Sequence, residues 1–219
     1  MLFRSLNAFE QTRDEAIGAA VVDALQHSAA LSSLRVETLK PRLAKFGPKV
    51  EKKAEPLYAT LSAELAQQRA KLEETLAQLA GGDVRRGQTV FNSSKAACMS
   101  CHAIGYVGGV VGPDLTRIGQ IRSERDLLES ILLPSASFVR SYEPIAVAAK
   151  DGKVYSGVLR KDAADEIVLA TGAREEARIR RDEIEEIRPG SVSVMPAGLE
   201  KQLSLQELAD LIAFLRACR

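Results

Sequence analysis

The chain of 219 residues is poor in the residue types that most often bind metals or form cross-links. It has three cysteines, three methionines, two histidines and no tryptophan. Three cysteines, an odd number, do not make a disulfide framework. This scarcity also leaves few candidates for a metal ligand, which are Cys98, Cys101, Cys218, His27, His102, Met1, Met99 and Met195.

Long apolar runs and an excess of one charge are absent as well. No stretch approaches the roughly 18 consecutive apolar residues that cross a bilayer, so we expect no membrane span. The formal net charge is +1, which gives no reason to expect a nucleic acid as partner. Near the N-terminus, Glu10, Asp14 and Glu15 interrupt any apolar centre, so no signal peptide is visible.

Residues 1–81 have the pattern of a helical region. The segment 14–26 places apolar residues three and four positions apart, and a longer amphipathic helix is expected over residues 57–79. The prolines at 41, 48 and 56 are expected to separate these helices. Gly81 and Gly82 end the second helix and mark the boundary of a second domain, residues 82–219.

The second domain combines helices with a segment of a different period. Helices are predicted over residues 84–97, from Ser123 to the residues before Pro134, and from Ser204 onward, each with a capping residue at its start. Glycines between residues 105 and 112 indicate a loop. Between about residues 142 and 188, alternating apolar residues predict four short strands in a small antiparallel β insert. Its charged outward positions suggest an interaction surface.

The strongest motif in the chain is Cys98-Met99-Ser100-Cys101-His102. A Cys-x-x-Cys-His run is the attachment signature of haem c. The two thiols can form thioether bonds at one edge of the macrocycle, and the adjacent imidazole then points at the iron. The motif therefore predicts one covalent haem at Cys98 and Cys101, with His102 as an iron ligand.

Two other kinds of site use the same cysteine spacing. A structural zinc site needs four ligands, and only Cys218 and His27, at opposite ends of the chain, remain to complete one. A thioredoxin-like dithiol should follow a strand and open a helix. Here a predicted helix precedes the motif and a glycine-rich loop follows it, which favours haem.

The second axial ligand has to be inferred. Met195 precedes the last helix on a loop, from which a thioether could reach the open face of the haem and raise its reduction potential. His27 is an alternative if the N-terminal helices fold over the haem, and an open or water-ligated iron is another. Met195 could also simply pack in its loop.

A ligating imidazole usually donates its second N–H to a carbonyl or a carboxylate. The segment Gly112-Pro113-Asp114-Leu115 is placed to supply such a carbonyl to His102, although it could also be a plain turn.

Residues 82–214 resemble the planctomycete-type haem-binding domain, a variant of class I cytochrome c. The resemblance covers about three-fifths of the chain and is carried by the ordered stretches 87–91, 98–102, 112–116, 127–135, 151–152 with 156–157, 195–199 and 208–215. It implies a mainly α fold, the class I cytochrome c fold with a small antiparallel β insert, preceded by a helical N-terminal region that ends a helical-repeat domain.

The resemblance also assigns roles to particular residues. It implies that the Pro113 carbonyl accepts from the proximal His102, that Met195 is the sixth ligand of the iron, and that the first and last helices of the domain cross where Gly87 and Phe91 meet Phe214. The β insert accounts for the long separation between His102 and Met195.

These residues predict an electron carrier, not an enzyme. Two protein ligands would saturate the iron, which favours outer-sphere transfer of single electrons. The alternative is a haem enzyme or ligand-binding haem sensor with an open distal site. Expected partners are redox proteins, such as a dehydrogenase or a larger respiratory-type complex. Because haem c is attached outside the cytoplasm, a periplasmic or otherwise exported location is expected.

Overall fold

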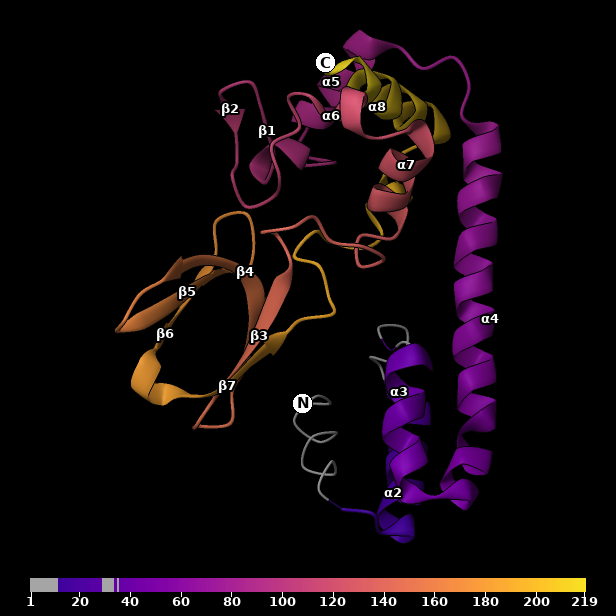
Figure 1. Cartoon of the computed structure of the whole chain (residues 1–219). Helices are drawn as coiled ribbons and strands as arrows, with labels where there is room; N and C mark the ends of the chain where they lie inside the picture. Colours follow the sequence, from indigo (N-terminus) through magenta and orange to yellow (C-terminus); the bar gives the residue numbers. More distant parts are fainter. Residues whose placement is uncertain (1–11, 29–33, 35) are drawn as a thin grey trace. The chain divides into compact units, whose positions relative to one another are not determined.

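The computed structural model describes residues 12–28, 34 and 36–219 (Figure 1). The chain forms two compact units, Met1–Ala70 and Lys71–Arg219. The boundary between them falls inside the longest helix of the described residues, α4, which runs from Pro48 to Gln78.

The first unit is helical over its described residues, as the sequence predicts. The helices are α2 (Glu15–Gln26), α3 (Val36–Leu43), the 3₁₀ turn η2 (Ala44–Phe46) and the first part of α4. Asp14 caps α2, because its carboxylate accepts from the backbone N–H of Ala16 at 2.8 Å. The expectation that prolines separate the helices is wrong at Pro41 and Pro56, which lie inside α3 and α4. Only Pro48 stands at a helix start, where no N–H is needed.

The helices of the second unit pack around one apolar cluster. They are α5 (Val84–Asn92), η3 (Cys98–Ser100), α6 (Ile118–Ile121), α7 (Glu124–Leu132), η5 (Leu199–Gln202) and α8 (Leu205–Ala217). Ser123 and Ser204 form the capping boxes expected at α7 and α8. Helix α5 ends five residues before the predicted Ala97. The most deeply buried members of the cluster include Leu72, Phe91, Leu128, Leu211 and Ile212.

Helices α5 and α8 cross at very close range. A Cβ atom at Gly87 would lie 1.9 Å from the Asp210 carbonyl oxygen, so only glycine fits there. The Phe91 and Phe214 rings pack beside this point in a tilted arrangement, with their centroids 5.6 Å apart and their planes at 56°. The contact expected between Gly87, Phe91 and Phe214 is therefore present.

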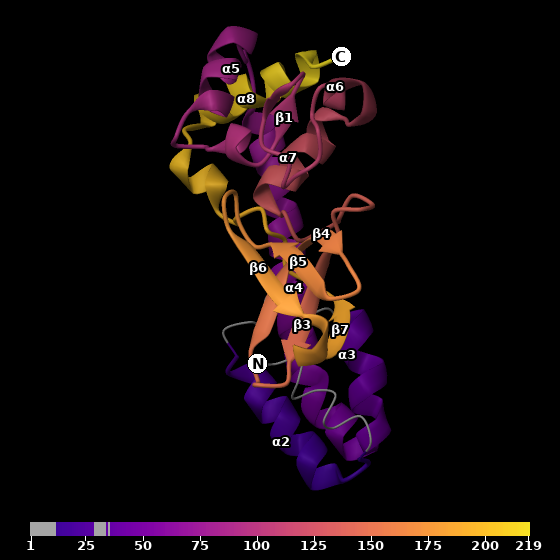
Figure 2. The same cartoon turned by 90° about the vertical axis from the view of Figure 1, so that its left-hand side faces the viewer.

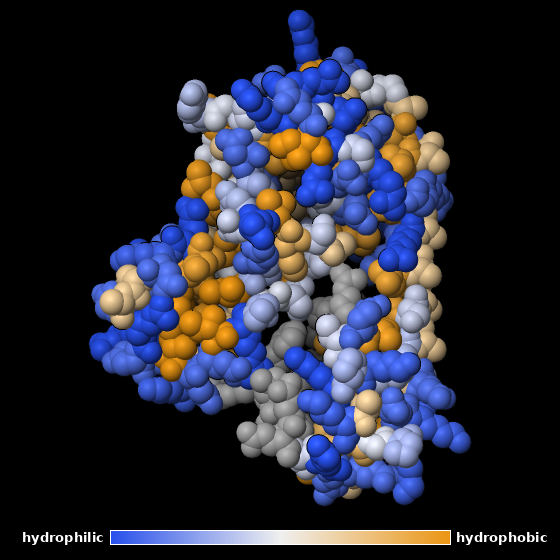
Figure 3. Space-filling view, viewed as in Figure 1, coloured by the Kyte–Doolittle hydropathy of each residue, from blue (hydrophilic) through white to orange (hydrophobic). Residues whose placement is uncertain are grey.

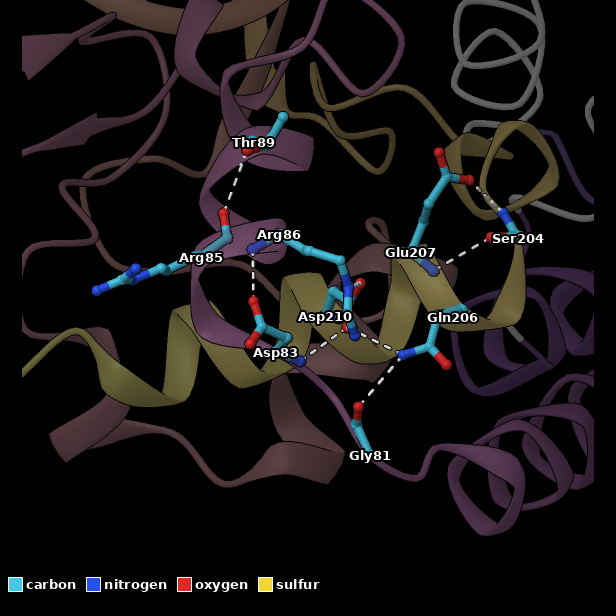
Figure 4. Close-up of polar contacts among 9 residues, drawn as sticks. All are labelled: Gly81, Asp83, Arg85, Arg86, Thr89, Ser204, Gln206, Glu207 and Asp210. Atoms are coloured by element: carbon cyan, nitrogen blue, oxygen red, sulfur yellow. Dashed lines mark hydrogen bonds and ion pairs between the residues drawn. The ribbon is translucent and has the colours of Figure 1, made fainter.

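A buried carboxylate fixes the same crossing. Asp210 is 2% exposed and accepts hydrogen bonds from the Asp83 N–H, from Gln206 and, at 2.7 and 2.8 Å, from the guanidinium of Arg86 (Figure 4). These donors hold the pKa of Asp210 well below its usual range, with the Arg86 hydrogen bonds as the largest cause. The start of α5 is thereby tied to the middle of α8.

Residues 144–189 form a five-stranded antiparallel sheet (Figure 2). The strands are β3 (Pro144–Ala149), β4 (Val154–Asp162), β5 (Glu166–Ala170), β6 (Glu176–Arg180) and β7 (Ile184–Pro189), in the order β6-β5-β4-β3-β7. The last strand therefore returns beside the first. Val147, Ile167, Leu169 and Ile179 form a core of the sheet's own. Apolar side chains also gather over the sheet on the face seen in Figure 3. Val154, Leu159 and Ile187 are among the large apolar residues of the sheet that are exposed.

The prediction of a mainly α, class I cytochrome c fold is wrong. The chain is an α/β mixture with this five-stranded sheet and a second sheet of two strands, β1 (Ala103–Ile104) and β2 (Val107–Gly108). Three strands, β1, β2 and β7, were missing from the expectation. The charges of β7 hid its alternation, and the glycines around β1 and β2 indicated only a loop. The sheet has its own apolar core, so it is a main structural element of the chain and not a small insert in a helical fold.

Within the described ranges, no helix is long and apolar enough to cross a membrane, in agreement with the sequence.

Candidate haem site

The Cys98–His102 motif lies in a tight turn directly after α5. Ala97 has a left-handed backbone with φ of 50°, a strained conformation for alanine, which turns the chain into η3. The Cys98 carbonyl then accepts from the N–H groups of Cys101 at 3.1 Å and His102 at 3.0 Å. The turn holds the three motif residues together, with Cys98, Cys101 and His102 all half-buried.

The orientation of His102 follows from one hydrogen bond. Its Nδ1 lies 2.8 Å from the Pro113 carbonyl oxygen. A carbonyl can only accept, so Nδ1 carries the proton and donates, and Nε2 keeps its lone pair. Burial lowers the pKa of His102, which keeps the imidazole neutral. The hydrogen bond expected between His102 and Pro113 is present, and it leaves Nε2 as a metal-ligating atom; the ligand role itself stays a prediction.

The loop that carries Pro113 is hydrogen-bonded to the motif along its length. The backbone N–H of Gly109 donates to Met99, that of Gly112 to Cys101 and that of Leu115 to Ala103, each at 2.8 Å. Gly112 itself lies directly against the imidazole, because a Cβ there would be 2.4 Å from Cε1 of His102. The loop therefore sets both the position and the tautomer of the ring.

The two motif thiols are not poised for dithiol redox chemistry. Burial raises the pKa of Cys98 to about 11 and also raises the pKa of Cys101. A nucleophilic dithiol needs the opposite shift, toward a stable thiolate. The cysteines are unbridged, and Cys218 is buried at the end of α8. Both motif thiols are therefore free to form thioether bonds.

Met195 borders the same apolar cluster as the motif. It is half-buried in the loop between β7 and η5, and both its side chain and that of Cys98 pack against the cluster around Phe91 and Leu211. His27, the alternative ligand, is exposed at the C-cap of α2 in the other unit and contacts the Asp23 carbonyl. Met99 also packs on the cluster. Met1 lies outside the described residues.

Two contacts of the loops that carry Pro113 and Met195 could not be found from the sequence. Arg160 of β4 donates to the Val110 carbonyl at 2.8 Å, in the loop between the motif and Pro113. Ser193 donates its N–H to the Ser135 hydroxyl at 3.0 Å. The partners are 50 and 58 residues apart and belong to no local pattern, so no signal in the sequence marks them.

The residues present fit haem better than zinc. Haem c requires two thiols, one imidazole whose other nitrogen is fixed by a hydrogen bond, and one further ligand. Cys98, Cys101 and His102 supply the two thiols and the imidazole within one turn. In the part of the chain that the structure describes, no three side chains of histidine, cysteine, aspartate or glutamate converge as a metal site would require. A zinc ion, which needs four ligands, would therefore find no sufficient set of ligands among these residues.

Comparisons with known proteins add no family: no family model matches the chain, and no curated protein is significantly similar to it. The resemblance to the planctomycete-type haem-binding domain stays a prediction from the motifs.

Proposed function

We propose that the chain is a c-type cytochrome that transfers single electrons through one covalently bound haem. The observation that carries this proposal is the pairing of a Cys-x-x-Cys-His turn with a His102 ring whose Nδ1–H donates to Pro113. That arrangement leaves two free thiols and one free imidazole nitrogen within five residues of sequence. In this proposal haem supplies a redox-active iron, and the protein holds it.

The chain's own residues would divide this task. Cys98 and Cys101 anchor the group covalently, which prevents its loss. His102 ligates through Nε2, and its hydrogen bond to Pro113 fixes the ring and raises its basicity. Met195 is the proposed second ligand, whose thioether stabilises reduced iron and so raises the reduction potential. If His102 and Met195 both held the iron, the chemistry that haem would supply is electron transfer without bond formation at the metal.

The wider setting of the proposal rests on the chemistry of haem c. Because attachment takes place outside the cytoplasm, we propose a periplasmic or otherwise exported protein. Its partners would be redox proteins, such as a dehydrogenase or a larger respiratory-type complex. The exposed residues Tyr106 and Val107 of the β1–β2 hairpin, and Val110 just after it, follow the motif, where a partner could approach it.

The test is a comparison of oxidised and reduced protein by visible spectroscopy, followed by addition of carbon monoxide to the reduced form. We expect a low-spin spectrum in both states and no binding of carbon monoxide, because His102 and Met195 would leave no site on the iron open. Rapid binding of carbon monoxide to the native protein would instead favour the alternative, a haem enzyme or sensor with an open distal site.

A further inference from the structure

The chain crosses between the helices and the five-stranded sheet twice, and the two crossings lie together. The first crossing follows α7, which ends at Leu132, and leads to β3 at Pro144. The second follows β7, which ends at Pro189, and leads through Met195 to η5. The proposed iron ligand Met195 is therefore on the second crossing.

Hydrogen bonds join these two crossings step by step. Strands β3 and β7 pair with each other, with Ile145 opposite Pro189. The Gly190 N–H donates to the Pro144 carbonyl at 2.7 Å. Beyond the sheet, the Ser193 N–H donates to the hydroxyl of Ser135 at 3.0 Å.

The last step reaches the methionine itself. The Ser193 hydroxyl accepts from the backbone N–H of Met195 at 3.1 Å. Ser193 thus uses its N–H toward Ser135 and its hydroxyl toward Met195. Both serines are half-buried, so losing either bond would leave a partly desolvated polar group without this partner.

We propose that Ser135 and Ser193 are positioning residues that hold the Met195 loop in place, so that Met195 would be available as an iron ligand. This inference rests on the proposed function, because it assigns a task to the loop that carries the second ligand. A thioether binds iron weakly, so it stays bound only if binding costs little conformational entropy. That cost is small when the loop that carries the methionine is already held in place. Ser135 fixes the loop to the residues after α7, and Ser193 passes that constraint on to the Met195 backbone.

The proposal gives the sheet a second role beside any interaction surface. Its first and last strands bring residues 135 and 193 together although they are 58 positions apart. Met195 can therefore be held firmly although it lies far from His102 in the sequence. The first and last strands of the inserted sheet pair with each other, which brings the two ends of the insert together beside the Met195 loop.

The test replaces each serine with alanine and measures how firmly the thioether holds the iron. The variants are S135A, S193A and the double variant. S130A is the matched control, since the Ser130 hydroxyl donates only within α7, to Asp126. Imidazole is titrated into oxidised protein, and loss of the weak thioether-to-iron band at the red end of the spectrum reports displacement of the methionine.

We expect S135A and S193A to bind imidazole about tenfold more tightly than the wild type, which corresponds to ~1.4 kcal/mol. The double variant should add little to S193A, because both changes break one chain of bonds. S135T and S193T keep a hydroxyl and should restore the wild-type imidazole affinity. A purely structural role would lower the melting temperature without this change in imidazole affinity.

Two results separate this inference from the proposed function. If the wild type shows the thioether band and both alanine variants bind imidazole as S130A does, the positioning role is wrong and the cytochrome assignment stands. If the wild type has no covalent haem, the proposed function fails first. Should S193A not fold, S135A and its threonine rescue decide the question alone.

Discussion

At the residue scale, His102 is the group on which the site depends. Its motif and the carbonyl partner at Pro113 could both be predicted from the sequence, because a Cys-x-x-Cys-His run requires a ligating ring and such a ring needs a hydrogen-bond acceptor. The packing of Gly112 against the ring could not, since it arises only when the loop folds back on the motif. The Ser135–Ser193 bond was unpredictable for the same reason.

Replacing Gly112 with alanine should loosen His102. The new Cβ would overlap the imidazole, and relieving the overlap must move the ring or the loop that carries Pro113. When His102 is held less firmly, a proton displaces the iron from its imidazole more easily. We therefore expect the low-spin spectrum of G112A to disappear at a higher pH than that of the wild type during acid titration.

The control for this titration is G172A. Gly172 lies in the turn between β5 and β6, and a Cβ there meets only the flexible side chain of Glu175 at 3.3 Å or more. G172A should follow the wild-type acid titration. An unchanged titration of G112A would show that Gly112 does not hold the ring.

At the element scale, helices α5, α7 and α8 were predictable because capping residues and apolar spacing are local signals. Strand β7 was not, because four of its six residues are charged or proline and only its pairing with β3 makes it a strand. The hairpin of β1 and β2 has two residues per strand, below the length at which alternation can be recognised. The fold class was wrong for these reasons.

The α5–α8 crossing gives a prediction with a definite pH dependence. The pKa of Asp210 is lower in the folded than in the unfolded protein, so its ionised form stabilises the fold. That contribution is complete above the unfolded pKa of about 4 and is lost as the pH falls toward the folded pKa. D210N removes it, and we expect a loss of about 2 kcal/mol in the free energy of unfolding at pH 7.

The measurement is denaturant unfolding of the wild type and D210N between pH 7 and pH 2. The difference between the two proteins should shrink below about pH 4. Glu207 also has a lowered pKa, of about 2, through Lys95 and Ser204, so D210N keeps part of the acid sensitivity. A difference that stays constant over the whole range would contradict the assignment of an ionised Asp210.

At the scale of the whole molecule, the sequence placed the domain boundary at the Gly81-Gly82 pair, whereas the compact units divide at residues 70 and 71. Leu72 is fully buried in the cluster beside the motif, and Leu76 and Leu79 pack on it. Amphipathic spacing shows which residues of a helix are buried but not which core they join. The end of α4 therefore belongs to the core of the candidate haem unit.

Two leucine substitutions test this division. L72A opens a cavity in the cluster that supports the motif, whereas L57A opens one in the core of the first unit. Each should cost about 2–5 kcal/mol in the unit that it affects. Heating followed at a haem absorption band should show a lower midpoint for L72A and an unchanged midpoint for L57A, while far-ultraviolet circular dichroism should detect both.

Equal shifts of the haem-detected midpoint in L72A and L57A would mean that the two units unfold as one. A haem-detected midpoint unchanged in L72A would separate α4 from the candidate haem unit.

The most direct test of the central claim is the intact mass of the protein purified from its native source and denatured in acid. A cytochrome c with thioether bonds at Cys98 and Cys101 keeps its haem under these conditions, so the mass should exceed that of the polypeptide by one haem. C98A and C101A should each retain at most a single thioether bond. A native mass equal to that of the polypeptide, with any haem released into the acid, would contradict the assignment.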